Sequence, residues 1–175
     1  GRDGGRTLSP TGPAQAGLEL NNQSGDFSPD NAAGPLFGNL GPGREVRLRA
    51  THNATTYDVF RGVIDAYDLT VDPPERTVHL GMVDAISQLA AVQVSTGLYE
   101  GLRTDQAIAI VLDEAGWGTA RDLDPGATMV HWWCADQVSA WDAIQQLVDS
   151  EGPGALATVD STGNFVFRSR HHRLL

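Results

Sequence analysis

Residues 18–49 constrain the fold more than any other part of the chain, because two strand patterns bracket a long segment that cannot be helical. The segments LEL at 18–20 and VRLR at 46–49 alternate apolar and polar residues, the period typical of half-buried strands. Turn-forming residues recur between them, at Gly25, Pro29, Gly34, Pro35, Gly38, Gly41, Pro42 and Gly43. Because glycine and proline fix turns and break helices, the sequence predicts a long structured loop joining two strands.

The loop also carries large apolar side chains, which favour burial over disorder. Phe27, Leu36, Phe37 and Leu40 lie among the turn residues, and loops of this length in compact domains tend to be functional. Two interpretations follow for the phenylalanines. Phe27 and Phe37 either fill the rim of their own sheet or dock into a neighbouring subunit, as aromatic anchors often do. We therefore take Phe27, Pro35 and Phe37 as candidate subunit contacts.

The rest of the first half also predicts β-structure. Strand patterns cover about 15–21, 44–51, 55–70 and 76–82, and short connections predict that the last three form an antiparallel meander. A sheet with one apolar face must close or pair, so we expect a small β-barrel or sandwich. The apolar spacing then becomes helical at 83–91, which predicts a short helix that plugs or caps the barrel.

The second half predicts a mixed structure. One helix should begin with Thr104 as its N-cap and end at Gly116, and another should begin at Ser139 and end at Gly152. Strands at 155–159 and 165–168 should form a hairpin, which a strand at 128–133 would extend to a three-stranded sheet. The fold class is therefore α+β, with two helices packed on a small antiparallel sheet in the second half.

We expect two domains. Residues 1–90 form the barrel-like domain and residues 91–175 form the mixed α/β domain with its C-terminal helix and hairpin. The chain begins with Gly1 rather than methionine, so we expect the first domain to be truncated at its N-terminus.

The charge of the chain argues against some partners. The formal net charge is −10, with 12 arginines and no lysine, and tight binding to nucleic acid depends on clustered cations. No segment is long and apolar enough to predict a membrane span. We expect neither specific nucleic-acid binding nor membrane insertion.

The sequence contains no convincing catalytic or metal-binding pattern. The cluster His131-Trp132-Trp133-Cys134 places a thiol near an imidazole, but residues three apart on a strand point to opposite faces. We expect these residues to pack in a core or an interface, with Cys134 buried. No phosphate-binding loop or spaced ligand set occurs either, so we predict no enzymatic activity, no metal and no cofactor.

Several motifs resemble the minor tail proteins of long-tailed phages and prophages of actinobacterial, high-GC hosts. The family pattern L-x-L-x-N matches residues 18–22, G-x-F-x-P-x-N matches residues 25–31, and P-G-R-x-V-R-x-R-A matches residues 42–50. The strand at 57–65 resembles the aromatic-x-x-F-x-G-x-(V/I)-D strand of the family, and 141–170 resembles its closing helix and hairpin. The resemblance covers most of the chain and rests on packing motifs.

The resemblance implies a structural component of the tail hub or baseplate in the virion, assembled in the host cytoplasm. Such proteins form trimeric or hexameric rings that join the tail tube to the host-recognition parts, so the partners would be copies of the chain and other tail-tip and tail-tube proteins. Two alternatives stay open: a carbohydrate-binding or receptor-binding module of a virion fibre, and a non-catalytic part of a tail-associated hydrolase.

Overall fold

Four strands form one curled antiparallel sheet in the order β1-β4-β3-β2. The computed structural model describes residues 12–70, 76–118 and 120–172. The strands are β1 (Gln15–Asn21), β2 (Glu45–His52), β3 (Thr55–Thr70) and β4 (Thr77–Val83). All four predicted strands are confirmed to within one residue, and the β2-β3-β4 meander is confirmed as well.

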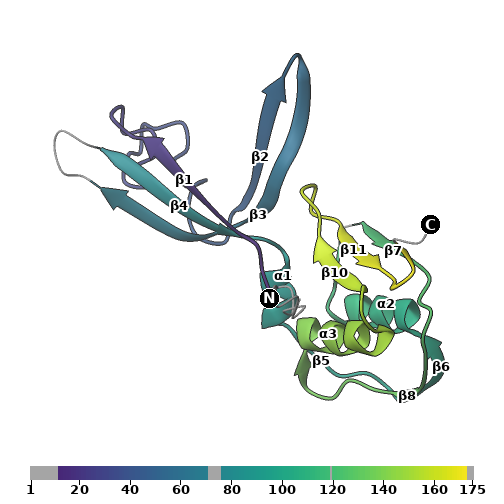
Figure 1. Ribbon diagram of the computed structural model, residues 1–175. Coiled ribbons are helices and arrows are strands. Elements are labelled where there is room, and N and C mark those ends of the chain that lie inside the picture. Colours follow the sequence, from purple (N-terminus) through teal and green to yellow (C-terminus); the bar gives the residue numbers. More distant parts are fainter. Residues whose placement is uncertain (1–11, 71–75, 119, 173–175) are drawn as a thin grey trace, which may run out of the picture.

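The long strand β3 divides the sheet into two parts that diverge (Figure 1). Its first half pairs with β2 and its second half with β4, and Val63 pairs with both Glu45 and Val83. The register shifts on either side of this crossing, between Leu48 and Arg49 and between Ile64 and Ala66. Because such bulges increase local bending and twist, the β2-β3 hairpin and the arm formed by β1, β4 and the end of β3 point in different directions.

The sheet is a half-barrel and does not close through the described strands. β1 and β2 lie at its two edges, and they follow the diverging ends of β3 (Figure 1). The predicted α+β class is therefore confirmed. The closed barrel or sandwich is replaced by an open curled sheet, since the bulges in β3 carry the two edge strands apart.

The helix after the sheet does not plug it, as the sequence had suggested. Helix α1 (Ile86–Ala91) buries Ile86 and Leu89 in the core of the second half. The Asp84 carboxylate accepts a hydrogen bond of 3.1 Å from the Ile86 amide, and the Ala140 amide donates to the Val92 carbonyl at 2.8 Å. These bonds direct the chain into the second half, although the division into domains at residue 90 stays a prediction.

The second half is an α/β body built around helices α2 (Thr104–Glu114) and α3 (Ala140–Glu151). Its sheet has the order β10-β11-β7, with β10 (Leu156–Val159), β11 (Phe165–Arg168) and β7 (Arg121–Leu123). Phe165 and Phe167 of β11 are completely buried beneath the helices. The predicted hairpin of β10 and β11 is confirmed.

The third strand of this sheet differs from the prediction. The segment expected there is β8 (Met129–Trp133), which instead pairs with β6 (Tyr99–Arg103). The third strand of the sheet is β7, which pairs with β11 in parallel, so the sheet is mixed rather than antiparallel. A three-residue strand such as β7 carries too short a pattern to be recognised in the sequence. Two shorter strands, β5 (Gln93–Val94) and β9 (Val138–Ser139), form another pair.

The ends of the helices agree with the sequence for α3 but not for the start of α2. Ser139 caps α3 by accepting a hydrogen bond of 3.0 Å from the Asp142 amide, and Gly152 ends it with φ of 98°. Thr104 was expected to cap α2, but Arg103 occupies the N-cap position. Thr104 is instead fully buried and donates its hydroxyl to Glu151 at 2.7 Å.

Glu151 is a buried carboxylate that joins three segments of the body. Its Oε2 accepts hydrogen bonds from the Thr104 hydroxyl at 2.7 Å and the Thr128 amide at 3.0 Å, and Oε1 accepts from the Ala127 amide at 2.8 Å. Burial alone would raise the pKa of Glu151, but these hydrogen bonds lower it below its usual value. The carboxylate therefore holds the start of α2 and the segment before β8 against the end of α3.

Candidate assembly surfaces

The long loop between β1 and β2 has a fixed shape because asparagine side chains hold it. Asn22 is buried; its side chain accepts a hydrogen bond of 3.0 Å from the Phe27 amide and donates one of 2.9 Å to the Ser28 hydroxyl. Asn31 donates its side-chain amide to the Gly25 carbonyl at 3.0 Å, and Gly25 has φ of 76°. The spacing of glycine, phenylalanine and asparagine seen in the sequence thus encodes a compact loop.

Phe27 lies against the sheet of its own chain. Its side chain is half-buried, and its carbonyl accepts a hydrogen bond from the Tyr67 hydroxyl of β3. Tyr67 pairs with Leu80 in the arm, on the same face as the buried Leu80 side chain. The Tyr67 hydroxyl therefore joins the loop to the sheet, and burial raises its pKa above the usual value.

Pro35 and Phe37 lie on the outer side of the loop. Both side chains are exposed, and Phe37 exposes 51% of its surface. The structure thus separates the three candidate residues into one that contacts its own sheet and two that face outward. Their contact with another subunit stays a prediction.

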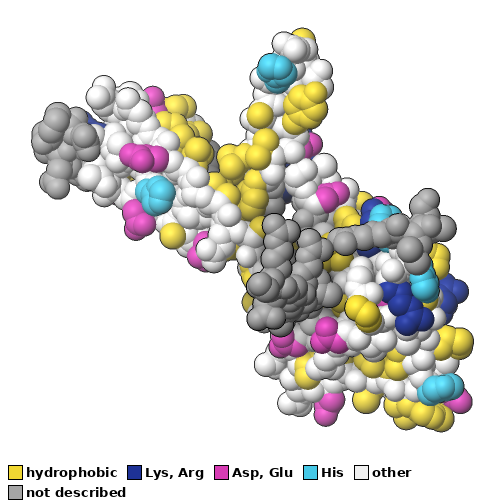
Figure 2. Space-filling view, in the orientation of Figure 1, with side chains coloured by type: hydrophobic (Ala, Val, Ile, Leu, Met, Phe, Trp, Pro, Cys, Tyr) yellow, Lys and Arg dark blue, Asp and Glu magenta, His cyan; other side chains and the backbone are white. Residues whose placement is uncertain are grey.

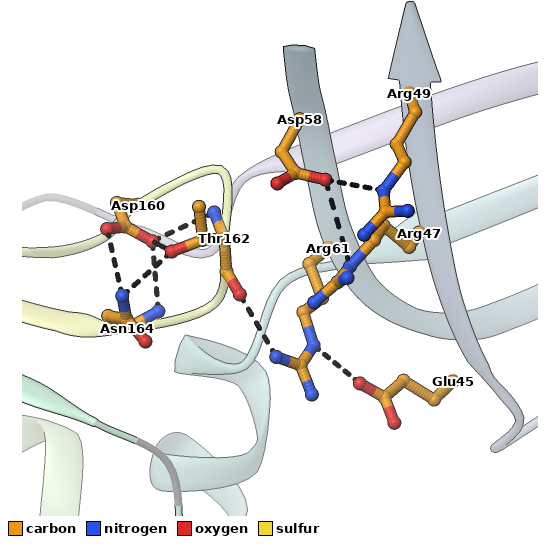
Figure 3. A network of polar contacts seen from close by, with 8 residues as sticks. All are labelled: Glu45, Arg47, Arg49, Asp58, Arg61, Asp160, Thr162 and Asn164. Carbon is orange, nitrogen blue, oxygen red and sulfur yellow. Dashed lines mark hydrogen bonds and ion pairs between the residues drawn. The ribbon is translucent and has the colours of Figure 1, made fainter. Parts of the chain in front are cut away.

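The β2-β3 hairpin carries an arginine face that the sequence did not reveal (Figure 3). Arg47 and Arg61 are direct partners across the two strands, and Arg49 follows Arg47 on the same face. Asp58 lies 2.8 Å from Arg49 but 3.9 Å from Arg47, measured from carboxylate oxygen to Nε. Register was the missing information, because two arginines distant in sequence become neighbours only once the strands are paired.

Arg61 also connects the hairpin to the body. Its Nε lies 2.5 Å from a carboxylate oxygen of Glu45, and its Nη1 donates to the Thr162 carbonyl at 3.0 Å (Figure 3). Thr162 belongs to the turn between β10 and β11, where the Asp160 carboxylate accepts hydrogen bonds from the amides of Thr162 and Asn164. Burial alone would raise the pKa of Asp160, but a hydrogen bond from the Thr162 hydroxyl, together with those from the amides, outweighs it and lowers the pKa. The turn is therefore a rigid platform for Arg61.

Exposed apolar side chains gather at two further places. Tyr57 and Val59 project from the outer part of the β2-β3 hairpin, each more than half exposed. Leu98, Met129 and Trp132 are exposed at the β6-β8 end of the body, and Figure 2 shows apolar side chains at that end of the molecule. The sequence did not indicate that Tyr57, Val59, Leu98 and Met129 are exposed, since apolar residues in strands ordinarily predict burial, whereas the cluster that contains Trp132 was expected in a core or an interface. Exposed apolar groups of this kind are typical of protein contact surfaces.

The cluster around Trp132 differs from the prediction. Cys134 is exposed rather than buried, because β8 ends at Trp133 and Cys134 begins the following loop. Trp133 packs against the body core, as expected, whereas Trp132 exposes 62% of its surface.

Within the described ranges, no group of three His, Cys, Asp or Glu side chains is arranged to hold a metal ion. Among the same residues, no helix has the length and apolar character needed to cross a membrane.

The architecture is shared with solved phage tail proteins, although no protein-family model and no curated protein sequence matches the chain. The 43 kDa tail protein of prophage MuSo2 from Shewanella oneidensis superposes with a TM-score of 0.56 and 14% identity over 91% of this chain and 44% of that protein. A tail protein from Neisseria meningitidis MC58 gives a TM-score of 0.51 and 17% identity over 63% of this chain and 34% of that protein. The chain thus spans less than half the length of either protein and has the fold of part of a phage tail protein.

Proposed function

We propose that this chain is a structural component of a phage tail tip or baseplate from an actinobacterial, high-GC host, and that it forms a ring joining the tail tube to the host-recognition parts. The observation that carries the proposal is the fold shared with a prophage tail protein over 91% of the chain. The exposed loop residues, the open sheet edges and the projecting hairpin supply surface for contacts between subunits.

The proposal is tested by the location and the stoichiometry of the protein. Immunogold labelling of purified phage particles is expected to mark the end of the tail, and native mass spectrometry is expected to give a trimer or hexamer. Label on the capsid alone, or no label on particles that contain every other tail protein, would refute a tail-tip role.

A carbohydrate-binding module is the second hypothesis, and the structure gives it less support. A sugar platform needs exposed, coplanar aromatic rings. Among the described tryptophans, Trp132 alone is mostly exposed, whereas Trp117 and Trp133 are half-buried and Trp141 is buried. The hydrolase alternative places its catalytic residues outside this chain, so it makes no prediction for the described residues.

Phe37→Ala is expected to weaken ring assembly without changing the melting temperature. The side chain is 51% exposed in the single chain, so its removal costs little folding free energy, while an aromatic anchor in an interface is worth about 2 kcal/mol or more. Oligomer mass and thermal unfolding are measured together.

Phe27→Ala provides the contrast, because the Phe27 side chain is half-buried in the single chain, in a loop segment that is bonded to its own sheet. It is expected to lower the melting temperature. Leu156→Ala, at another exposed apolar side chain, is the matched control and should change neither quantity. If Phe37→Ala lowered the melting temperature and left the oligomer intact, Phe37 would belong to its own fold rather than to an interface.

A further inference from the structure

The arginine face of the β2-β3 hairpin is defined by Arg47, Arg49 and Arg61. Like charges directly opposite each other on paired strands are destabilising, and Arg47 and Arg61 are such a pair. Two carboxylates accompany the three guanidinium groups, Asp58 at 2.8 Å from Arg49 and Glu45 at 2.5 Å from Arg61. Arg47 has only the contact of 3.9 Å with Asp58. The face therefore has one more positive charge than its own carboxylates balance, and an external anion would relieve the repulsion.

The face is open to a partner. Glu45, Arg47, Arg49 and Arg61 line a shallow depression, and the turn between β10 and β11 stands beside it (Figure 3). The side chains of Arg47 and Arg49 are 38% and 51% exposed. Guanidinium groups held on paired strands bind carboxylates with little loss of side-chain freedom.

The arm carries an acidic row of suitable shape. Glu19 of β1 and Asp68 of β3 both pair with His79 of β4, so the three residues lie in a line across one face of the arm. All three are exposed, and so is Asp65, three residues before Asp68 in β3. Among the described residues, neither Glu19 nor Asp68 has an ion pair. Figure 2 shows acidic side chains beside a histidine on the arm.

The two surfaces do not meet within one chain. The arm and the hairpin diverge from the middle of β3 (Figure 1), and the apolar residues of the arm face the opposite way from the acidic row, toward the loop that holds Phe27. The acidic row of a second copy of the chain can reach the arginine face, and its charge is opposite to that of the face.

We propose that the acidic row formed by Glu19 and Asp68 of one subunit docks on the arginine face formed by Arg47, Arg49 and Arg61 of the next. The inference rests on the proposed ring and names the surfaces that build it. Such a contact joins two different patches, so each subunit can bind the next in the same way. The subunits form a closed ring when the rotation from one to the next is a whole fraction of a full turn. Nucleic acid is the less suitable anion, because the chain as a whole has a net charge of −10 and repels a duplex.

The test reverses each surface separately and then both together, with the 175-residue chain and oligomer formation measured by mass photometry and analytical ultracentrifugation. R47E/R49E and E19K/D68K are each expected to weaken association by about tenfold or more. In a mixture of these two double variants, each variant repels copies of itself, but both contacts between the two variants join surfaces of opposite charge. The mixture should therefore recover association through alternating subunits. The quadruple variant restores opposite charges and should recover association to within a few-fold of the unmodified chain.

The matched control is E114K/D149K, which changes the net charge as much as E19K/D68K at exposed positions of the body. It should leave association unchanged. Because reversal of Arg49 removes the partner of Asp58, the single variant R47E is measured as well, and circular dichroism verifies that each variant is folded. Association should also weaken as NaCl is raised from about 50 mM to about 500 mM, since screening shortens the range of the attraction.

Three results would overturn the inference. If R47E and R47E/R49E are folded and associate like the unmodified chain, the arginine face is not an interface. Rings found on intact phage tails would still support the proposed function in that case. Failure of the quadruple variant to recover would show that the two surfaces are not partners. Binding of a short fluorescent DNA duplex that R47E/R49E abolishes would assign the arginine face to phosphate instead. A chain absent from tails would refute the proposed function itself.

Discussion

Glu151→Gln is expected to lower the free energy of unfolding by about 2–4 kcal/mol. The carboxylate accepts three hydrogen bonds from Thr104, Ala127 and Thr128 while fully buried. An amide of the same size presents an NH2 group to at least one of these donors, which leaves buried donors unsatisfied. Urea unfolding followed by circular dichroism measures the change.

Asp149→Asn is the matched control, since Asp149 lies two residues earlier in α3 with an exposed side chain. It is expected to change the free energy of unfolding by less than about 0.5 kcal/mol. Equal effects of the two substitutions would contradict a special role for Glu151.

The difference between Glu151→Gln and the unmodified chain should depend on pH. The pKa of Glu151 is lowered in the folded state, so its ionised form stabilises the fold, and this contribution is fully present above the pKa of the unfolded chain. It is lost as the pH falls through the lower, folded-state pKa. The unfolding free energies of the two proteins should therefore converge in acid, and a gap that stayed constant from neutral pH into acid would show that ionisation of Glu151 is not the source.

Gly62→Ala is expected to destabilise the curled sheet by about 3 kcal/mol or more, because the strands leave no room for a side chain at the crossing in β3. A Cβ atom there would lie 2.1 Å from the Val83 carbonyl oxygen and 2.8 Å from the Phe60 ring. Backbone cannot move aside as a flexible side chain can, so β3 and β4 must separate. Hydrogen exchange of the β3 and β4 amides and thermal unfolding measure the effect.

Gly17→Ala is the control in the same sheet. A Cβ at this position meets nothing closer than the His79 ring at 3.6 Å, an ordinary contact, so the stability should change little. Native amide protection of β3 and β4 in Gly62→Ala would contradict the inference that the two strands leave no room for a Cβ atom at the crossing.

Local patterns predicted the elements well where neighbouring residues in sequence decide the conformation. The alternation in residues 15–21 and 55–70 identified β1 and β3, and the residue types at Ser139 and Gly152 marked both ends of α3. Each of these signals acts within one strand or one helical turn. The same reasoning failed for β7, whose three residues pair in parallel with a strand more than forty positions later.

For the candidate contact residues, the sequence identified the loop but not the surroundings of each side chain. The sequence marked Phe27, Pro35 and Phe37 together as apolar or turn residues of one loop, but it could not separate them. The hydrogen bond from Tyr67 to the Phe27 carbonyl places Phe27 on its own sheet, whereas Pro35 and Phe37 face outward. The arginine face was invisible in the sequence, because it exists only through the register that sets Arg47 opposite Arg61.

The sequence by itself determined the strands of the first half, the principal helices, the turns that join them and an acidic chain with a long structured loop. Tertiary structure alone decided that the sheet stays an open half-barrel, that α1 joins the body, and which charged side chains stand together. The physical reason is the distance in sequence over which each feature is decided. Strand alternation, helix caps and turns depend on residues a few positions apart. Curvature at the bulges of β3, strand register and burial of Glu151 depend on segments that meet only in the folded chain.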